Sequence, residues 1–163
     1  MDEQEFTAWA AGVERRLLRS AYLLTGDLHR AEDLVQEALV KVALRWERLR
    51  TGNPTAYART VIARDNVSWW RRRRDVPVES TDELAAVSSD PDLALVVRRA
   101  LGRLTPRQRA VVVLRHFDDL SVEETAAVLG VAAGTVKSQN AQALARLRTG
   151  APEVLDLIGG GRG

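Results

Sequence analysis

Two adjacent tryptophans followed by four arginines form the most chemically suggestive run of the chain, Ser68-Trp69-Trp70-Arg71-Arg72-Arg73-Arg74. On a helix, neighbouring side chains point about 100° apart, so Trp69 and Trp70 cannot both lie deep in a small core. An exposed indole beside guanidinium groups can stack on an unpaired base while the arginines attract phosphates. The alternative is a tryptophan pair that closes the edge of the core, and the residues alone leave this open.

Residues 121–148 have the spacing of a short helix, a turn and a longer helix. Gly130, at the turn, can adopt the positive φ that lets two short helices cross steeply. This is helix-turn-helix geometry, in which the second helix enters a major groove about 12 Å wide. Polar side chains of medium length would face the groove, namely Thr135, Lys137, Ser138 and Gln139, and the arginines further along, Arg146 and Arg148, would meet phosphates. An ordinary helical hairpin with a polar outer face is the alternative.

A polar face on the second predicted helix is a third candidate surface. It carries Glu32, Asp33, Gln36 and Glu37, opposite an apolar stripe of Ala31, Leu34, Val35, Ala38, Val42 and Trp46. Such faces are most often only solvated, so the pattern by itself identifies no partner.

Enzymatic chemistry finds little support in the sequence. It contains no nucleophile–base pair, no phosphate-binding glycine loop and no cluster of metal ligands, and the adjacent Asp118 and Asp119 suit a turn. His29 and His116 are isolated and there is no cysteine, so we expect no metal and no cofactor. The lack of cysteine, of an apolar run of membrane-spanning length and of a signal-peptide pattern favours a cytoplasmic protein without membrane insertion.

Charge is unevenly distributed along the 163 residues, although the net charge is only +2. Basic residues outnumber acidic ones in 45–74 and again in 93–149, whereas 76–92 holds acidic residues and no basic one. Two basic blocks around an acidic spacer indicate a polyanionic partner, most commonly nucleic acid. Arginine-rich faces that merely solvate the protein are the alternative.

Helical spacing runs through the sequence and no strand pattern appears, which predicts an all-α fold. Capping and stop signals divide it into helices at 3–24, 28–49, 54–74, 91–104, 106–117, 122–129 and 133–148. In the fourth helix the apolar stripe of Leu93, Val96, Val97, Ala100, Leu101 and Leu104 is expected to face inward. The predicted architecture is two small helical domains on a flexible linker: 1–75, the acidic linker 76–92, 93–150 and a flexible C-terminal tail, 151–163.

Five stretches, in order, resemble the extracytoplasmic-function (group 4) sigma factors of the sigma-70 family, most closely their actinobacterial SigE-like branch. They are 21–27 (AYLLTGD), 31–38 (AEDLVQEA), 68–74 (SWWRRRR), 104–115 (LTPRQRAVVVLR) and 134–139 (GTVKSQ). The resemblance covers nearly all of 6–148. It implies a transcription initiation factor that binds core RNA polymerase and promoter DNA, with an anti-sigma factor as a further candidate partner.

The resemblance also implies roles for each surface. The second helix would bind a coiled coil of the polymerase's largest subunit, with contact candidates Asp33, Gln36, Glu37, Leu34 and Lys41. The third helix and the loop before it would read and open the minus-10 element, through Arg64, Asp65, Asn66, Trp69, Trp70, Arg71, Arg72, Arg73 and Arg74. The last helix would read the minus-35 element, through Thr135, Lys137, Ser138, Gln139, Gln142 and Arg146.

One departure leaves the base-reading residue open. Many members carry an Asn, and four residues later an Asp, before the arginine run, where this chain has Arg64 and Ser68. Two rival functions also remain from the residues alone. One is a stand-alone helix-turn-helix regulator, which leaves the first three helices unexplained. The other is a helical adaptor that binds only proteins, with its arginines as solubilising groups.

Overall fold

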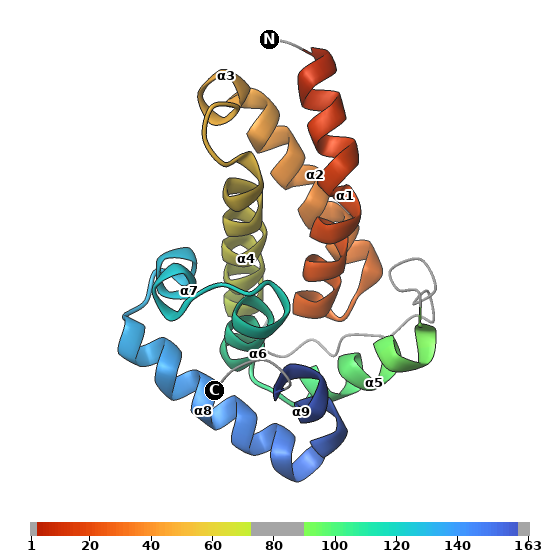
Figure 1. The fold of residues 1–163 in the computed structure, drawn as a ribbon, viewed down its shortest axis with the longest axis vertical. Helices are drawn as coiled ribbons and strands as arrows, with labels where there is room; N and C mark the ends of the chain where they lie inside the picture. Colours follow the sequence, from red (N-terminus) through yellow and green to blue (C-terminus); the bar gives the residue numbers. More distant parts are fainter. Residues whose placement is uncertain (1–2, 73–89, 160–163) are drawn as a thin grey trace. The chain divides into compact units, whose positions relative to one another are not determined.

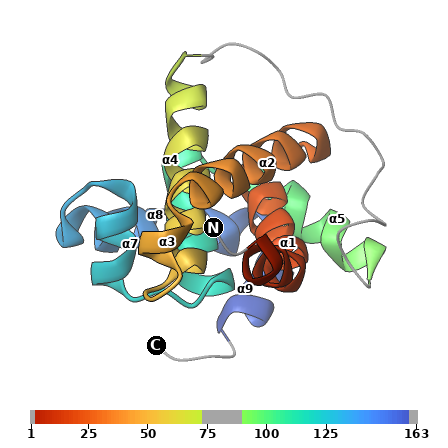
Figure 2. The same cartoon turned by 90° about the horizontal axis from the view of Figure 1, so that it is seen from above.

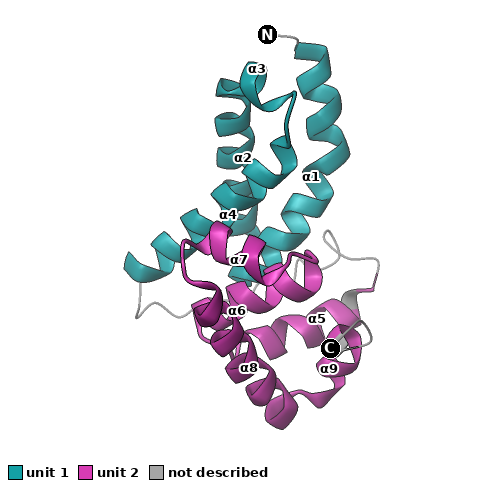
Figure 3. Cartoon of the chain, turned by 60° about the vertical axis from the view of Figure 1, so that its left-hand side comes forward, with its two compact units in different colours: residues 1–81 teal, residues 82–163 magenta. Residues whose placement is uncertain are grey.

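The computed structural model describes residues 3–72 and 90–159, which belong to two compact units, 1–81 and 82–163 (Figure 3). All regular structure in these described ranges is helical, which confirms the predicted all-α fold. Most of the expected linker 76–92 lies outside the described residues, as do Arg73, Arg74 and 160–163. Each unit has its own buried core.

The described part of the first unit consists of α1 (Glu3–Thr25), α2 (Leu28–Leu44), the single-turn α3 (Trp46–Leu49) and α4 (Pro54–Arg72). α2 crosses and contacts both α1 and α4, and α1 also contacts α4 (Figure 1, Figure 2). The predicted signals hold at the helix ends. Gly26 has φ 71°, and Asp27 caps α2 through the Arg30 N–H. Asn53 caps α4 by accepting the Ala56 N–H at 2.9 Å.

The core of the first unit is built from the apolar stripes that helical spacing predicts. Its large, fully enclosed side chains come from all three long helices: Leu17, Val35, Val42 and Ile62. At the start of α1, Phe6 and Trp9 pack on Trp46, with ring centroids 5.4 and 5.5 Å from it. Trp9 also donates its indole N–H to the Thr55 hydroxyl at 3.1 Å, which ties α1 to the first turn of α4.

The second helix differs from the prediction, because it ends at Leu44 and not near residue 49. Arg45 leaves the helical region at φ −120°, ψ 16°, and its N–H turns to the Val42 carbonyl. The chain then resumes as α3, whose Trp46 is 3% exposed in the aromatic cluster with Phe6 and Trp9. Burial of this large ring offsets the helical hydrogen bonds lost at the break.

The described part of the second unit consists of α5 (Pro91–Leu101), α6 (Pro106–Val112), the π-turn η2 (Val113–Phe117), α7 (Val122–Leu129), α8 (Ala133–Gly150) and α9 (Pro152–Gly159). α8 is the long central helix of this unit and contacts α6, α7 and α9 (Figure 1). Two helix starts carry the predicted capping boxes, Thr105 with Gln108 and Ser121 with Glu124. Both fix where a helix begins, independently of tertiary contacts.

The helix that begins at Pro106 widens into the π-turn η2 before it ends at Phe117, its predicted end. The Asp118 N–H donates to the Val113 carbonyl, five residues back, at 2.9 Å. Within the wide turn, Arg115 donates to the Leu120 carbonyl at 2.6 Å. His116 Nε2 lies 2.8 Å from the Asn140 amide oxygen, so the turn is also hydrogen-bonded to α8.

Two expectations for the second unit are wrong. Leu93 and Val96 are 41% and 37% exposed, because only the later turns of α5 reach the core. Within the expected flexible tail, where the sequence predicts at most one loose turn at 153–158, residues 152–159 form an eight-residue helix, α9, which packs on α8 and α5. Val154 is fully buried there and Ile158 is 7% exposed, so burial of the apolar side of α9 holds it in place.

Candidate nucleic-acid and protein interfaces

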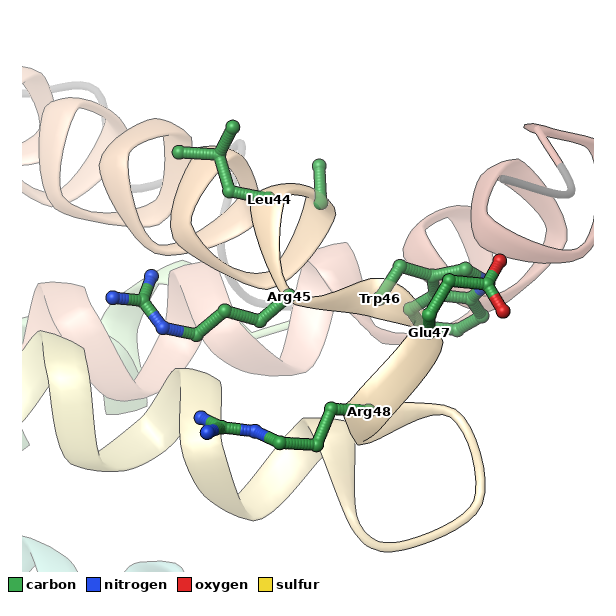
Figure 4. Close-up of a pocket in the computed structure, with 6 residues that line it drawn as sticks. Leu44, Arg45, Trp46, Glu47 and Arg48 are labelled. Carbon is green, nitrogen blue, oxygen red and sulfur yellow. The ribbon is translucent and has the colours of Figure 1, made fainter.

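The outer side of α2 presents carboxylates in line with exposed aliphatic side chains. Asp33, Gln36 and Glu37 are exposed, as the sequence predicts. Val40 and Leu44 continue the same side of the helix and are 57% and 77% exposed. In Figure 4, Leu44 points away from the body of α4. Acidic groups beside exposed aliphatic side chains suit a protein partner with basic and apolar residues better than they suit nucleic acid.

Two other predicted contacts on α2 have different positions. Leu34 is 3% exposed and belongs to the core, so its assignment to the contact surface is corrected. Lys41 directs its ammonium group to α4, where Nζ lies 3.1 Å from the Asp65 Oδ2. One predicted polymerase contact and one predicted DNA contact are therefore partners of each other.

The tryptophan pair near the end of α4 is half-buried, so neither ring lies deep in the core or stands free. The Trp69 and Trp70 rings pack edge to face, with centroids 5.0 Å apart. The guanidinium of Arg30, from the first turn of α2, lies 3.9 Å from the Trp69 ring centroid, a cation–π contact. Nothing in the sequence around Arg30 could have indicated this contact.

The rest of the predicted DNA face of α4 divides by burial. Arg64, Arg71 and Arg72 are exposed. Asn66 is only 1% exposed, because it lies on the inner side of α4 with Ile62, so its assignment as a base reader is corrected. Its amide oxygen has no hydrogen-bond partner among the described residues.

A shallow hollow at the junction of α2 and α3 adds two arginines that the predicted site does not include. It is lined by residues 43–48, among them Arg45 and Arg48. Figure 4 shows both guanidinium groups extended to the same side, along α4. The Arg45 guanidinium lies 5.9 Å from the Tyr57 ring centroid. The basic character of 45–74 was the one sequence signal for these side chains.

The second unit contains the predicted helix-turn-helix. Its α7 ends at Gly130, which has φ 67°, ψ 37° and whose N–H returns to the Ala126 carbonyl. Val111, Ala126 and Val136 form the core that joins α6, α7 and α8, with Val122, Leu129 and Val131 packed against them. This packing holds α8 so that one side of its first turns faces solvent.

The exposed side of α8 carries most of the predicted reading residues. Lys137, Ser138 and Gln142 are exposed, whereas Thr135 and Gln139 are half-buried. Gln142 accepts a hydrogen bond from Gln108 of α6 and donates one to Ser138, both at 3.4 Å, which orients its amide.

Near the end of α8, two arginines join this helix to the segment between α5 and α6 by hydrogen bonds in both directions. Arg146 donates to the Arg103 carbonyl at 3.4 Å, and Arg103 donates to the Gly150 carbonyl at 2.8 Å. Both side chains line a shallow hollow at the end of α8. Arg103 was not a predicted site residue, and it reaches α8 only through the fold of the unit.

Comparison with known proteins decides the family. Residues 9–76 match the model of sigma-70 region 2, and residues 94–147 match that of sigma-70 region 4. The chain belongs to the sigma-70 family of RNA polymerase sigma factors. The two matches fall on the first and second units, respectively.

Relatives of this sigma factor include proteins named as extracytoplasmic-function (ECF) sigma factors, such as SigM of Mycobacterium tuberculosis, which is 32% identical over 137 residues, covering 82% of this chain and 70% of the relative. The chain is 43% identical over 150 residues to the RNA polymerase sigma-E factor of Streptomyces coelicolor, covering 88% of this chain and 84% of the relative. It is 41% identical over 152 residues to the sigma-E factor of Streptomyces avermitilis, covering 88% and 83%. Among solved structures, Bartonella quintana RpoE, crystallised with the anti-sigma factor NepR, is 28% identical with TM-score 0.72 over 98% of this chain and 99% of that one.

The resemblance inferred from the five sequence stretches is thereby confirmed, as is the function that it implied. The chain is a sigma factor, which directs RNA polymerase to promoters. Within the described residues, no helix is long and apolar enough to cross a membrane.

Proposed function

We propose that the two units divide promoter recognition between them. The first unit binds core RNA polymerase through the outer side of α2 and engages the minus-10 element with α4. The second unit reads the minus-35 element with α8. The observation that carries this proposal is that the acidic and aliphatic side of α2 and the basic side of α4 belong to different helices of one unit. One small unit can therefore hold a protein and a DNA strand together.

On the first unit, opposite charges sort the two partners. Asp33 and Glu37 on α2 would repel phosphates, whereas Arg64, Arg71 and Arg72 on α4 would attract them. The half-buried Trp69–Trp70 pair lies among these arginines and offers ring surface to separated bases.

On the second unit, the first turns of α8 would enter the major groove. Lys137 and Ser138, which are exposed, and Gln139, which is half-buried, would meet base edges there. Arg146, two turns beyond Gln139, would contact a phosphate in exchange for its hydrogen bond to the Arg103 carbonyl. We place this factor in the cytoplasm, without an enzymatic reaction of its own, and expect regulation by an anti-sigma factor, as the complex of the Bartonella relative illustrates.

The docking surface is tested by reversing the charges of Asp33 and Glu37 to lysine. Because both side chains are exposed, helicity and melting temperature should stay within the small range typical of surface substitutions. Affinity for core RNA polymerase, measured by fluorescence titration, should fall at least tenfold, since charge reversal places like charges against the partner.

The matched control replaces Glu3 and Glu14, two exposed carboxylates of α1, by lysine. It therefore changes the net charge by the same amount as the Asp33 and Glu37 variant does. This control should assemble with polymerase as the parent does. Normal assembly of the Asp33 and Glu37 variant would show that α2 does not provide the docking surface.

A further inference from the structure

One ion pair joins the two helices of the first unit that are proposed to carry different partners. Lys41 Nζ on α2 lies 3.1 Å from Asp65 Oδ2 on α4, with side chains 43% and 31% exposed. Asp65 is the only acidic residue in the sequence of α4, which otherwise carries Arg59, Arg64, Arg71 and Arg72. α4 is therefore a basic helix with a single carboxylate, and the charge of that carboxylate is neutralised by Lys41 of α2.

Helical spacing places this carboxylate beside the groups proposed to hold the promoter strand. Trp69 lies four residues after Asp65, and Arg72 lies seven residues after Asp65. Both side chains are therefore on the same side of α4 as Asp65, one and two turns further along the helix. Arg64 is the preceding residue and is exposed. A carboxylate at this position repels phosphates within a Debye length unless a cation compensates it.

On α2, the same pair borders the proposed polymerase surface. Lys41 lies one turn beyond Glu37 but turns its ammonium group toward α4, and so away from a partner bound on the outer side of α2. Because the pair is partly exposed, its contribution to folding stability is small, and its effect on the local charge of α4 is the larger consequence.

We propose that the Lys41–Asp65 pair sets the strength with which α4 holds the phosphates of the promoter strand. Lys41 acts as a positioning residue: it neutralises the one carboxylate of α4 and holds that carboxylate against α2. Lys41 is then not a polymerase contact, and Asp65 is not a base reader. This inference rests on the proposed function of α4 as the helix that carries minus-10 DNA.

Three variants of the full chain give effects of different sign. Each is assembled with core RNA polymerase and titrated with a forked promoter oligonucleotide. Lys41→Met should weaken DNA binding about threefold and Asp65→Asn should strengthen it about threefold, as expected for one unit charge near a phosphate in high dielectric. The double variant should bind the promoter oligonucleotide with an affinity close to that of the parent. Asp65→Asn should also make the plot of the logarithm of the DNA-binding constant against the logarithm of salt concentration steeper, by up to about one unit of slope. The reason is that the Lys41 ammonium group is then free to contact a DNA phosphate.

The control is Glu14→Gln, which removes one carboxylate from the exposed side of α1 and changes the net charge as Asp65→Asn does. The inference is overturned if Asp65→Asn strengthens DNA binding no more than this control does. It is also overturned if Lys41→Met lowers affinity for core polymerase while its DNA binding, once assembled, equals that of the parent. If the parent itself shows no polymerase-dependent DNA binding, the proposed function fails, and the role of the pair fails with it.

Discussion

At the end of α4, contacts from another helix decide what each tryptophan can do. Arg30 lies 3.9 Å from the centroid of the Trp69 ring and covers one of its faces, so a base would have to displace this guanidinium to stack there. Trp70 packs edge to face on Trp69 and has no such cation in the described structure. Of the two rings, Trp70 is therefore the better candidate to support a separated promoter strand.

Replacement of Trp70 by alanine should impair promoter opening. A stacked base contributes about 1–3 kcal/mol, so open-complex formation should fall about fivefold or more. Polymerase binding and closed-complex formation should be retained, and a pre-melted promoter should restore transcription, because the unstacking cost is then already met. Permanganate footprinting of unpaired thymines on duplex and pre-melted templates measures this. Trp70→Phe, which keeps an aromatic ring, is the control; equal opening by the alanine variant and the parent would move the melting role to the loop at 50–53.

On α8, the residues proposed to read bases and those proposed to contact phosphates should give different specificity profiles. Gln139→Ala should cost about 1–3 kcal/mol at one or two base positions, because a lost base contact is local. Arg146→Ala should weaken binding to all sequences alike, because a phosphate contact carries no sequence information. Transcription from a library of minus-35 variants distinguishes the two patterns. A uniform loss for both variants would mean that the reading face of α8 lies elsewhere.

At the scale of elements, α9 contributes to the core of the second unit. Val154 is fully buried against it, so Val154→Ala should lower the free energy of unfolding by about 2 kcal/mol, counting lost burial and the residual cavity. Leu157→Ala is the matched control on the same helix, because Leu157 is 51% exposed and should matter much less. Urea unfolding of both variants measures the difference. Equal, small effects would show that α9 is not part of the folded core.

Elements marked by local signals could be predicted from the sequence, and elements held by distant contacts could not. Gly26, Asp27 and the two capping boxes act within a few residues, so the helix starts they mark agree with the structure. The break at Arg45 depends on packing of Trp46 against α1, and α9 depends on its packing against α8 and α5. The break at Arg45 has no local signal comparable to a cap, whereas α9 begins at Pro152, a residue favoured at the first helical position.

The candidate site follows the same rule. Exposure of Asp33 and Glu37 on α2, and of Lys137, Ser138 and Gln142 on α8, was predictable from helical spacing, because each set lies opposite an apolar stripe. The inner position of Asn66, the cation–π contact of Arg30 and the Lys41–Asp65 pair depend on how α2 crosses α4, and spacing within one helix cannot show that.

At the scale of the whole molecule, the distribution of charge is more informative than its sum. The net charge is only +2, yet basic residues gather in the two segments that match sigma-70 regions 2 and 4. Arginines that served only to solvate the protein would not need to be concentrated in these two segments. Two separate basic units suit a factor that holds two promoter elements at once, with affinity that falls steeply as salt rises.

Direction of core RNA polymerase to promoters with two spaced DNA elements can be measured by reconstituting the full chain with core enzyme, transcribing a pool of promoter fragments and mapping the RNA 5′ ends. We expect new start sites to appear only when the factor is present. They should lie at a fixed distance from a two-part motif whose upstream part changes in preference with Gln139→Ala. Start sites identical to those of core enzyme alone, or a motif that lacks the upstream part, would contradict this expectation.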